Sequence, residues 1–151
     1  MEQHCRQFSR KPYQIWYHVL KTIRSQPKSV YDIHDHISLH YMFQLRRGLS
    51  PLRSHKYRHK FSNTPNDTCY CHRGNEDEKQ FLFECLQFAN YRVSLAVKVT
   101  NILLRNNLAR LSNEVNLYIN GHPNLTIIDN KEISSATIHF IKCTERFKSP
   151  R

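Results

Sequence analysis

The sequence has few glycines, no long apolar run and no opening that resembles a leader. Only three of its 151 residues are glycine, whereas β-sheet folds built on many tight turns normally need more. No stretch approaches the roughly 18 apolar residues that a membrane-spanning helix requires. Residues 1–10 are polar and charged, without the apolar segment of a secretory signal. We therefore expect a helical protein located inside the cell, in the nucleus or cytoplasm, with no membrane partner.

Acidic residues are missing from one long segment of the chain. Between His36 and Asn66 there is no Asp or Glu, against six Lys or Arg and four His. The whole chain has a formal net charge of +11 at pH 7. A solvated helix face normally mixes charges of both signs, and like charges this dense repel one another. Because a polyanion relieves that repulsion, the segment predicts contact with the phosphates of RNA or DNA; a basic protein without a specific partner is the alternative.

Residues 39–61 form a basic arm that supplies the candidate contacts to nucleic acid. Its cationic side chains would bind phosphates without reading the base sequence, and its aromatic side chains could stack on unpaired bases. The predicted contact residues are Arg46, Arg47, Arg53, Lys56, Tyr57, Arg58 and Lys60. Phe61 could also stack on a base, although it fits the core of the protein equally well.

Three of the five cysteines follow the basic arm, within a Cys loop at residues 69–85. Their spacing is Cys69-x-Cys71-x8-Gln80-x4-Cys85. A structural zinc site takes four ligands and prefers thiolate and imidazole, and position 80 is where a zinc knuckle would have histidine. A carboxamide is neutral and hard, so Gln80 is a poor zinc ligand beside thiolates. The odd number of cysteines and the absence of a leader favour thiols or metal ligands over a disulfide framework.

Histidines could supply the missing fourth ligand. His72 directly follows Cys71, which makes ligation by both awkward, whereas His55 and His59 lie one helical turn apart and could face the thiols. The alternative is a collapsed knuckle whose thiols are buried without metal. The sequence leaves zinc binding open between these two interpretations.

Apolar residues recur at helical spacing through most of the remaining chain. The first expected helix spans 12–25, with Trp16 as a core anchor, and the second runs from a Ser38 cap to Gly48. A third helix is expected at 51–61 after a Ser50 cap, and a fourth at 81–106 with a break near 86–88. A capping box of Asp129 and Glu132 opens the last one. Buried stripes are predicted to include Leu49 and Tyr91. The segment 115–119 fits either a short strand or a last helical turn.

These patterns predict a mainly α protein. An N-terminal helical segment, residues 1–27, precedes a single small helical domain, residues 28–148, in which the knuckle-like Cys loop lies between helices. The last helix shows a narrow apolar seam of Ile133, Ala136, Phe140, Cys143 and Phe147.

Residues 28–148 resemble the region that follows the polymerase domain in the reverse-transcriptase polyproteins of non-LTR, LINE-type retrotransposons. The matching pieces are 45–53, 55–61, the Cys69-x-Cys71 pair, 81–85 and a tail near 141–147. In that family the region is similar to a CCHC zinc knuckle linked to nucleic-acid binding. The resemblance implies zinc as a cofactor and Cys69, Cys71 and Cys85 as ligands. Gln80 departs from the histidine of the family, which suggests a decaying copy or one released from selection for zinc.

Catalysis is not expected from this chain. It lacks the aspartate pair with which a polymerase holds two magnesium ions. The pattern of Asp67 and Asp77-Glu78-Lys79 is superficially similar to a restriction-like nuclease, but acids at 76–78 are better explained as the start of a helix. We expect a non-catalytic fragment that binds RNA or DNA and no small-molecule substrate. The alternatives are a helical remnant with no function of its own, and a protein-interaction module that uses the seam of the last helix.

Overall fold

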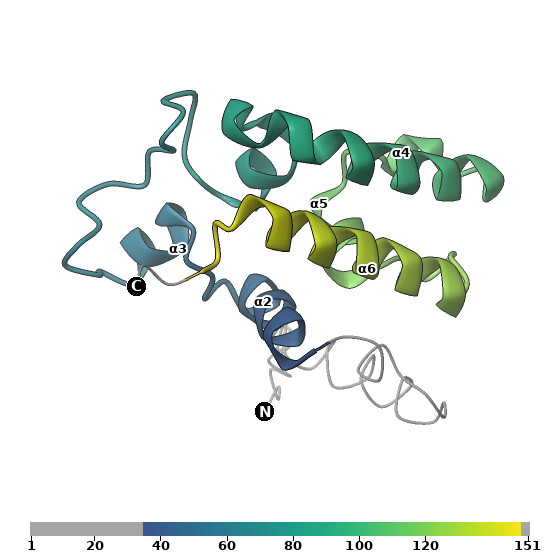
Figure 1. Ribbon diagram of the computed structural model, residues 1–151, viewed down its shortest axis with the longest axis horizontal. Helices are drawn as coiled ribbons and strands as arrows, with labels where there is room; N and C mark the ends of the chain where they lie inside the picture. The colour runs from purple at the N-terminus through teal and green to yellow at the C-terminus, as the bar shows by residue number, and fades with distance from the viewer. Residues whose placement is uncertain (1–34, 149–151) are drawn as a thin grey trace, which may run out of the picture. The chain divides into compact units, whose positions relative to one another are not determined.

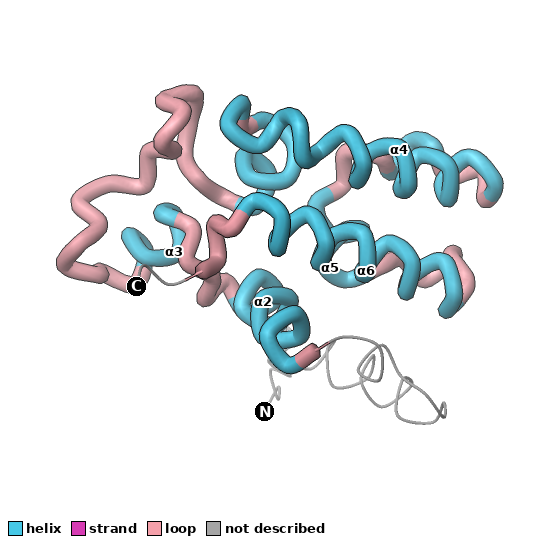
Figure 2. The backbone as a smooth tube through the Cα atoms, viewed as in Figure 1, coloured by secondary structure: helices cyan, strands magenta, loops and turns pink. Residues whose placement is uncertain are grey.

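Helices joined by loops make up residues 35–148, the part of the chain that the computed structural model describes (Figures 1 and 2). The helices are α2 (His36–Arg47), α3 (Arg53–Arg58), the π-helix η2 (Gln80–Glu84), the 3-10 helix η3 (Leu86–Phe88), α4 (Ala89–Arg105), the 3-10 helix η4 (Ala109–Leu111), α5 (Val115–Asn120) and α6 (Ile127–Thr144). The predicted mainly α fold, with a cysteine-bearing loop between helices, is confirmed. The predicted segment 1–27 and Trp16 lie outside the described residues.

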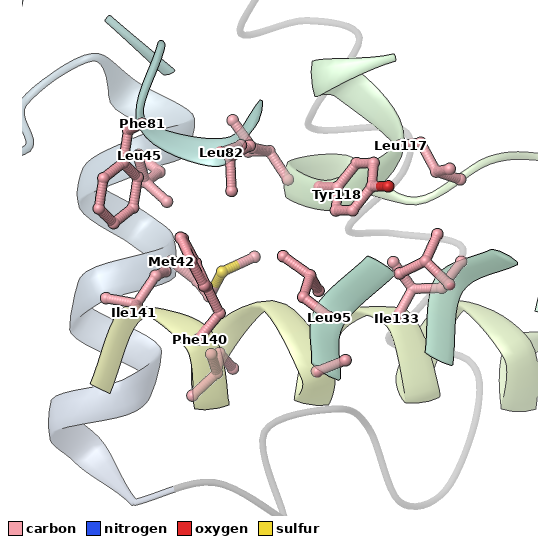
Figure 3. Packing of buried hydrophobic residues seen from close by; sticks show 14 of the residues in the cluster. Met42, Leu45, Phe81, Leu82, Leu95, Leu117, Tyr118, Ile133, Phe140 and Ile141 are labelled. Atoms are coloured by element: carbon pink, nitrogen blue, oxygen red, sulfur yellow. The ribbon is translucent and has the colours of Figure 1, made fainter. Parts of the chain in front are cut away.

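The long helices α4 and α6 lie side by side, and α2 and α5 pack against α6 (Figure 1). Leu95, Val99 and Leu103 of α4 are buried against this layer, as the apolar periodicity predicts. Figure 3 shows how side chains from α2, η2, α4, α5 and α6 meet in one core. None of the helices in residues 35–148 is long and apolar enough to cross a membrane.

Phe81 joins the end of the Cys loop to this core. Its ring is fully buried, with centroids 5.1 Å from Phe140 of α6, 5.3 Å from Phe88 of η3 and 5.5 Å from Phe147. Aromatic pairs of this kind contribute about 0.5–1.5 kcal/mol each beyond the burial of their area. The C-terminal end of the Cys loop is therefore fixed to α6 and to the segment that follows α6.

Several helix ends differ from their predicted positions. The α2 cap is Asp35, whose Oδ1 accepts from the Ser38 N–H at 2.8 Å, so Ser38 is not the cap; Gly48 does end α2, with φ of 62°. The α6 cap is Thr126, which accepts from the Asp129 N–H at 3.1 Å. Asp129 does not open the helix, because its carboxylate binds Arg105 of α4. The predicted capping box is thus three residues too late.

The helix of the basic arm is shorter than predicted. It begins at Arg53 instead of residue 51, because the Ser50 hydroxyl lies 2.6 Å from His55 Nδ1 and does not cap the helix. It ends at Arg58, and Lys60 has a positive φ of 57°. The open choice at 115–119 is settled as helix α5, and the predicted break near 86–88 is confirmed by η3.

Two positions assigned to buried stripes face solvent. Leu49 is 50% exposed because α2 ends at Gly48 before reaching it, and Tyr91 of α4 is 47% exposed. The seam of α6 shows the opposite outcome: Ile133, Ala136, Phe140 and Phe147 are buried and Cys143 is half-buried. The domain itself covers the seam, so the seam offers no surface to a protein partner.

Phe140→Ala is expected to destabilise the fold by about 3–5 kcal/mol, since it removes a buried ring and leaves a cavity against Phe81. Phe43→Ala is the matched control, because Phe43 is 55% exposed on α2. We expect the control to change the unfolding free energy by about 0.5 kcal/mol or less. Urea unfolding followed by circular dichroism measures both, and equal effects would contradict this description of the core.

Candidate metal centre and basic surface

Three cysteine sulfurs converge in the Cys loop. The Sγ atoms of Cys69 and Cys71 are 3.4 Å apart, those of Cys69 and Cys85 are 3.6 Å apart, and all three lie within 4.8 Å of one another. Cys69 and Cys85 are buried, and Cys71 is half-buried. A tetrahedral ion with zinc–sulfur bonds near 2.3 Å would separate its sulfurs by about 3.8 Å. The three sulfurs therefore fit one face of such a site.

A tight turn and a π-helix bring these cysteines together. The Cys69 N–H donates to the Gly74 carbonyl at 2.7 Å and the His72 N–H donates to the Cys69 carbonyl at 2.9 Å. His72 and Gly74 have positive φ values of 58° and 142°, which reverse the chain. Cys85 follows η2, where its N–H donates to the Gln80 carbonyl at 2.7 Å.

Each of the three sulfurs accepts a backbone N–H from the residue two positions further on. Cys69 accepts from Cys71, Cys71 from Arg73, and Cys85 from Gln87. Such bonds favour the ionised form of a thiol. The loop is thus arranged to hold thiolates, which are the form of cysteine that binds metal.

The three thiols differ in acidity. Burial raises the pKa of Cys69 to about 12 and also raises the pKa of Cys85. Burial opposes ionisation of Cys71 as well, but the Arg73 N–H and hydrogen bonds with Cys69, Cys85 and Gln80 outweigh it and lower its pKa to about 7. Cys71 is therefore the thiol most readily ionised, and a cation among the sulfurs would favour ionisation of the other two.

Gln80 lies beside the sulfurs at the position where histidine was expected. Its side chain is buried, and Nε2 donates to the Cys71 Sγ at 3.2 Å. Its Oε1 faces Gly74, where an added Cβ would lie 3.5 Å away. The cysteine spacing correctly predicted that residue 80 lies at the cluster, but the Gln80 side chain donates a hydrogen bond to a thiol.

The three candidate histidines are not brought to the cluster. His59 and His72 are exposed, and neither belongs to the group of neighbouring ligand atoms. His55 is buried, and its Nδ1 accepts the Ser50 N–H at 3.2 Å, so Nε2 carries the proton and donates to Glu78 Oε1 at 2.7 Å. Against the effect of burial, this bond lowers the pKa of Glu78. His55 therefore fixes α3 to the Cys loop, and the prediction of His72 or His59 as fourth ligand is not supported.

A buried ion pair between Glu76 and Arg146 holds the loop from the other side. Glu76 is 1% exposed, and its carboxylate accepts from Arg146 Nε at 2.6 Å and Nη2 at 2.5 Å. The Arg53 N–H donates to the same carboxylate at 2.8 Å. Arg146 Nη2 also donates to the Pro51 carbonyl at 3.0 Å. Sequence reasoning assigned Glu76 to a helix start, and no local signal reveals a partner 70 residues away.

The basic arm presents only part of its predicted phosphate-binding residues to solvent. Arg47, Tyr57, Arg58 and Lys60 are exposed, together with His59 and Phe61, whereas Lys56 and Arg53 are half-buried. We call Tyr57–Phe61 and Arg47 the basic surface. Arg46 is half-buried, and its Nε donates to the Ile119 carbonyl of α5 at 2.9 Å.

Tyr70 is an aromatic side chain that the sequence reasoning did not select. It is 55% exposed, and the Arg53 guanidinium lies 4.8 Å from its ring centroid. Arg53 Nη2 also donates to Asn66 Oδ1 at 2.8 Å. Arg53 therefore belongs partly to the packing of the Cys loop and only partly to the surface.

The acidic residues near the loop have structural partners. The Asp77 carboxylate accepts from the Gln80 N–H at 2.8 Å, as expected for a helix start, and Glu78 binds His55.

The three cysteines are the only candidate metal ligands that cluster in the described part of the chain. No other group of three or more His, Cys, Asp or Glu side chains there is close enough to share an ion. Comparison of the chain with protein-family models, curated proteins and solved structures gives no match. The function is therefore inferred from the site residues themselves.

Glu76→Gln is expected to destabilise the protein by about 3–5 kcal/mol, because it leaves a largely buried Arg146 without its counter-ion. The matched control is Glu84→Gln, since Glu84 is 46% exposed and pairs with Lys79 at 3.0 Å. That surface pair is worth about 1 kcal/mol or less. Urea unfolding of the two variants measures the difference, and similar small losses in both would show that the buried pair does not hold the loop.

Proposed function

We propose that this protein is a non-catalytic nucleic-acid-binding unit, similar to the region after the polymerase in LINE-type polyproteins. The observation that carries the proposal is the way α3 is held. Buried His55 and the Glu76 carboxylate fix this short helix, while Arg58, His59 and Lys60 project into solvent from its end. A rigid helix that presents cations without neighbouring acids in its sequence suits a phosphate backbone.

The basic surface would bind by charge and stacking. Its guanidinium and ammonium groups would contact phosphates and release counter-ions, which gives affinity without base specificity. Tyr57 and Phe61, 50% and 55% exposed, would offer ring faces to unpaired bases. Arg46 has no part in this mechanism as proposed, because its guanidinium is directed at α5.

The Cys loop would hold a zinc ion through Cys69, Cys71 and Cys85. Three of the four positions of a structural site fit, since the sulfurs converge and receive N–H bonds. Gln80 does not fit the fourth position as a ligand, because its amide N–H faces the sulfur. When bound, the ion would offset most of the charge of the thiolates and cross-link the two ends of the loop that supports α3.

Nucleic-acid affinity is expected to fall steeply with salt, and the double variant Arg58→Gln, Lys60→Gln tests the basic surface. For a single strand, the slope of log affinity against log salt changes by about 0.7 for each phosphate that the protein no longer neutralises. We expect the double variant to reduce the slope by about 1.4 on that basis. Fluorescence anisotropy with a labelled mixed-sequence oligonucleotide measures it.

The matched control is Lys98→Gln with Arg110→Gln, two exposed cations on α4 and η4. We expect this pair to leave the slope unchanged. Equal slopes in the two double variants would place binding elsewhere on the protein. Absence of any binding at low salt would favour a helical remnant without function of its own.

The reduced protein is expected to hold about one zinc per chain, as a single three-cysteine cluster predicts. Cys71→Ser should lose the ion, and a chelator should reduce helicity only in protein that holds zinc. Cys143→Ser is the control, because Cys143 is a half-buried cysteine on α6 outside the cluster. Elemental analysis after gel filtration gives the stoichiometry, and equal zinc content in both variants would refute the assignment.

A further inference from the structure

We propose that the three thiolates also bind Cu(I), in a three-coordinate site, and that Cu(I) displaces zinc from them. In this site Gln80 is a hydrogen-bond donor to Cys71 and not a ligand. The inference rests on the metal-binding role proposed for the Cys loop and names the class of ion that the loop selects. It starts from the presence of Gln80 where a zinc knuckle has a histidine ligand.

The orientation of Gln80 follows from the chemistry of its neighbour. A thiolate only accepts hydrogen bonds, so the NH₂ end of a carboxamide is the end that can bond to it. Gln80 Nε2 takes that place, 3.2 Å from the Cys71 Sγ, with Oε1 toward Gly74. An amide nitrogen has no free lone pair for a metal. Gln80 in this orientation therefore adds a donor N–H to the cluster and no ligand.

The backbone of Gln80 is held in place. Its N–H donates to Asp77 Oδ1 at 2.8 Å, and its carbonyl accepts from the Cys85 N–H at 2.7 Å. The residue that follows is Phe81, fully buried among aromatic rings. A turn of the amide oxygen toward the sulfurs would exchange a hydrogen bond for a contact between two acceptors.

The number of available ligands distinguishes Cu(I) from zinc at this site. Structural zinc sites are closed by four ligands, and no histidine among the described residues completes this group. Soft thiolates suit Cu(I), which is satisfied by two or three of them. Three buried or half-buried sulfurs within 4.8 Å thus meet the full requirement of Cu(I) and only part of the requirement of zinc.

The surroundings accept the negative charge of such a site. Three thiolates with a monovalent ion carry a net charge of −2, one more negative charge than with zinc. The Arg92 guanidinium donates to the carbonyls of Leu82 and Cys85, both at 2.7 Å, and so lies next to the cluster. The three N–H donors to sulfur act in the same direction.

The test compares two variants of Gln80 by the ratio of their zinc and Cu(I) dissociation constants. The full chain, reduced and kept anaerobic, is titrated with Cu(I) against bathocuproine disulfonate and with zinc against a chromophoric chelator. Gln80→His supplies the missing imidazole, and Gln80→Leu removes the amide with little change in volume. Circular dichroism reports whether each variant keeps its helices, and the ratio is unaffected by a loss of folding that weakens both ions equally.

We expect Cu(I) to bind at one per chain and to displace zinc from the wild-type protein. Gln80→His should increase the affinity for zinc relative to Cu(I) by about tenfold or more, which is the size of effect that changes around a metal site typically have. Gln80→Leu should weaken the binding of both ions and leave the ratio of their dissociation constants within about threefold. A hydrogen-bond donor outside the ligand shell supports the thiolates whichever ion they bind. X-ray absorption of the copper form should show three sulfurs and no nitrogen or oxygen.

Four results would overturn the proposal. If Gln80→Leu weakened zinc binding and left Cu(I) binding unchanged, Gln80 would be a zinc ligand. A light-atom ligand on copper would exclude the three-coordinate site. Zinc binding while Cu(I) stays on the competitor would reject this inference and leave the proposed function intact, whereas failure of both ions to bind would refute the metal role itself. The salt slope of nucleic-acid binding is measured separately, so the nucleic-acid proposal is tested apart from these results.

Discussion

The ion pair of Glu76 with Arg146 is the contact on which the candidate site depends. A carboxylate that is 1% exposed must be paired, since removal of either partner would leave a buried charge. Here one carboxylate joins three parts of the chain: the Cys loop, the start of α3 through the Arg53 N–H, and the segment after α6. The Ser54 N–H adds a bond of 3.2 Å to the Glu76 carbonyl. Charge and hydrogen bonds thus hold this side of the loop.

This arrangement links the Cys loop to the helix that carries part of the basic surface. The Cys loop is fixed to α3 at Glu76 and again through Glu78 and His55, and it is fixed to the core at Phe81. The position of α3, which carries Arg58 and precedes Lys60, is therefore tied to that of the loop. The buried groups hold the start of the helix, and its end is exposed to solvent.

The sequence predicted well what depends on periodicity and spacing, and poorly what depends on distant partners. Helical spacing located the core of α4 and α6, Gly48 ended α2, and cysteine spacing located the cluster. The predicted start of α3 was wrong because the Ser50 hydroxyl pairs locally with His55. The predicted capping box of α6 was wrong because Thr126 caps the helix, while the Asp129 carboxylate binds Arg105 on another helix. A pattern in one segment cannot reveal a partner on another. The donor role of Gln80 was missed for a related reason, since spacing places a residue but does not orient its amide.

Replacement of histidine by Gln80 would alter the bonding of the site more than its charge. Imidazole and carboxamide are both neutral, but the ring nitrogen offers a lone pair where this amide offers an N–H. A hydrogen bond adds about 1 kcal/mol of stability, whereas structural zinc contributes about 10–16 kcal/mol to the folding of small metal-dependent domains. The bond from Gln80 to Cys71 cannot replace that contribution. Glu76, His55 and Phe81 also order the loop around the three thiols, for which the described residues supply no fourth His, Cys, Asp or Glu ligand.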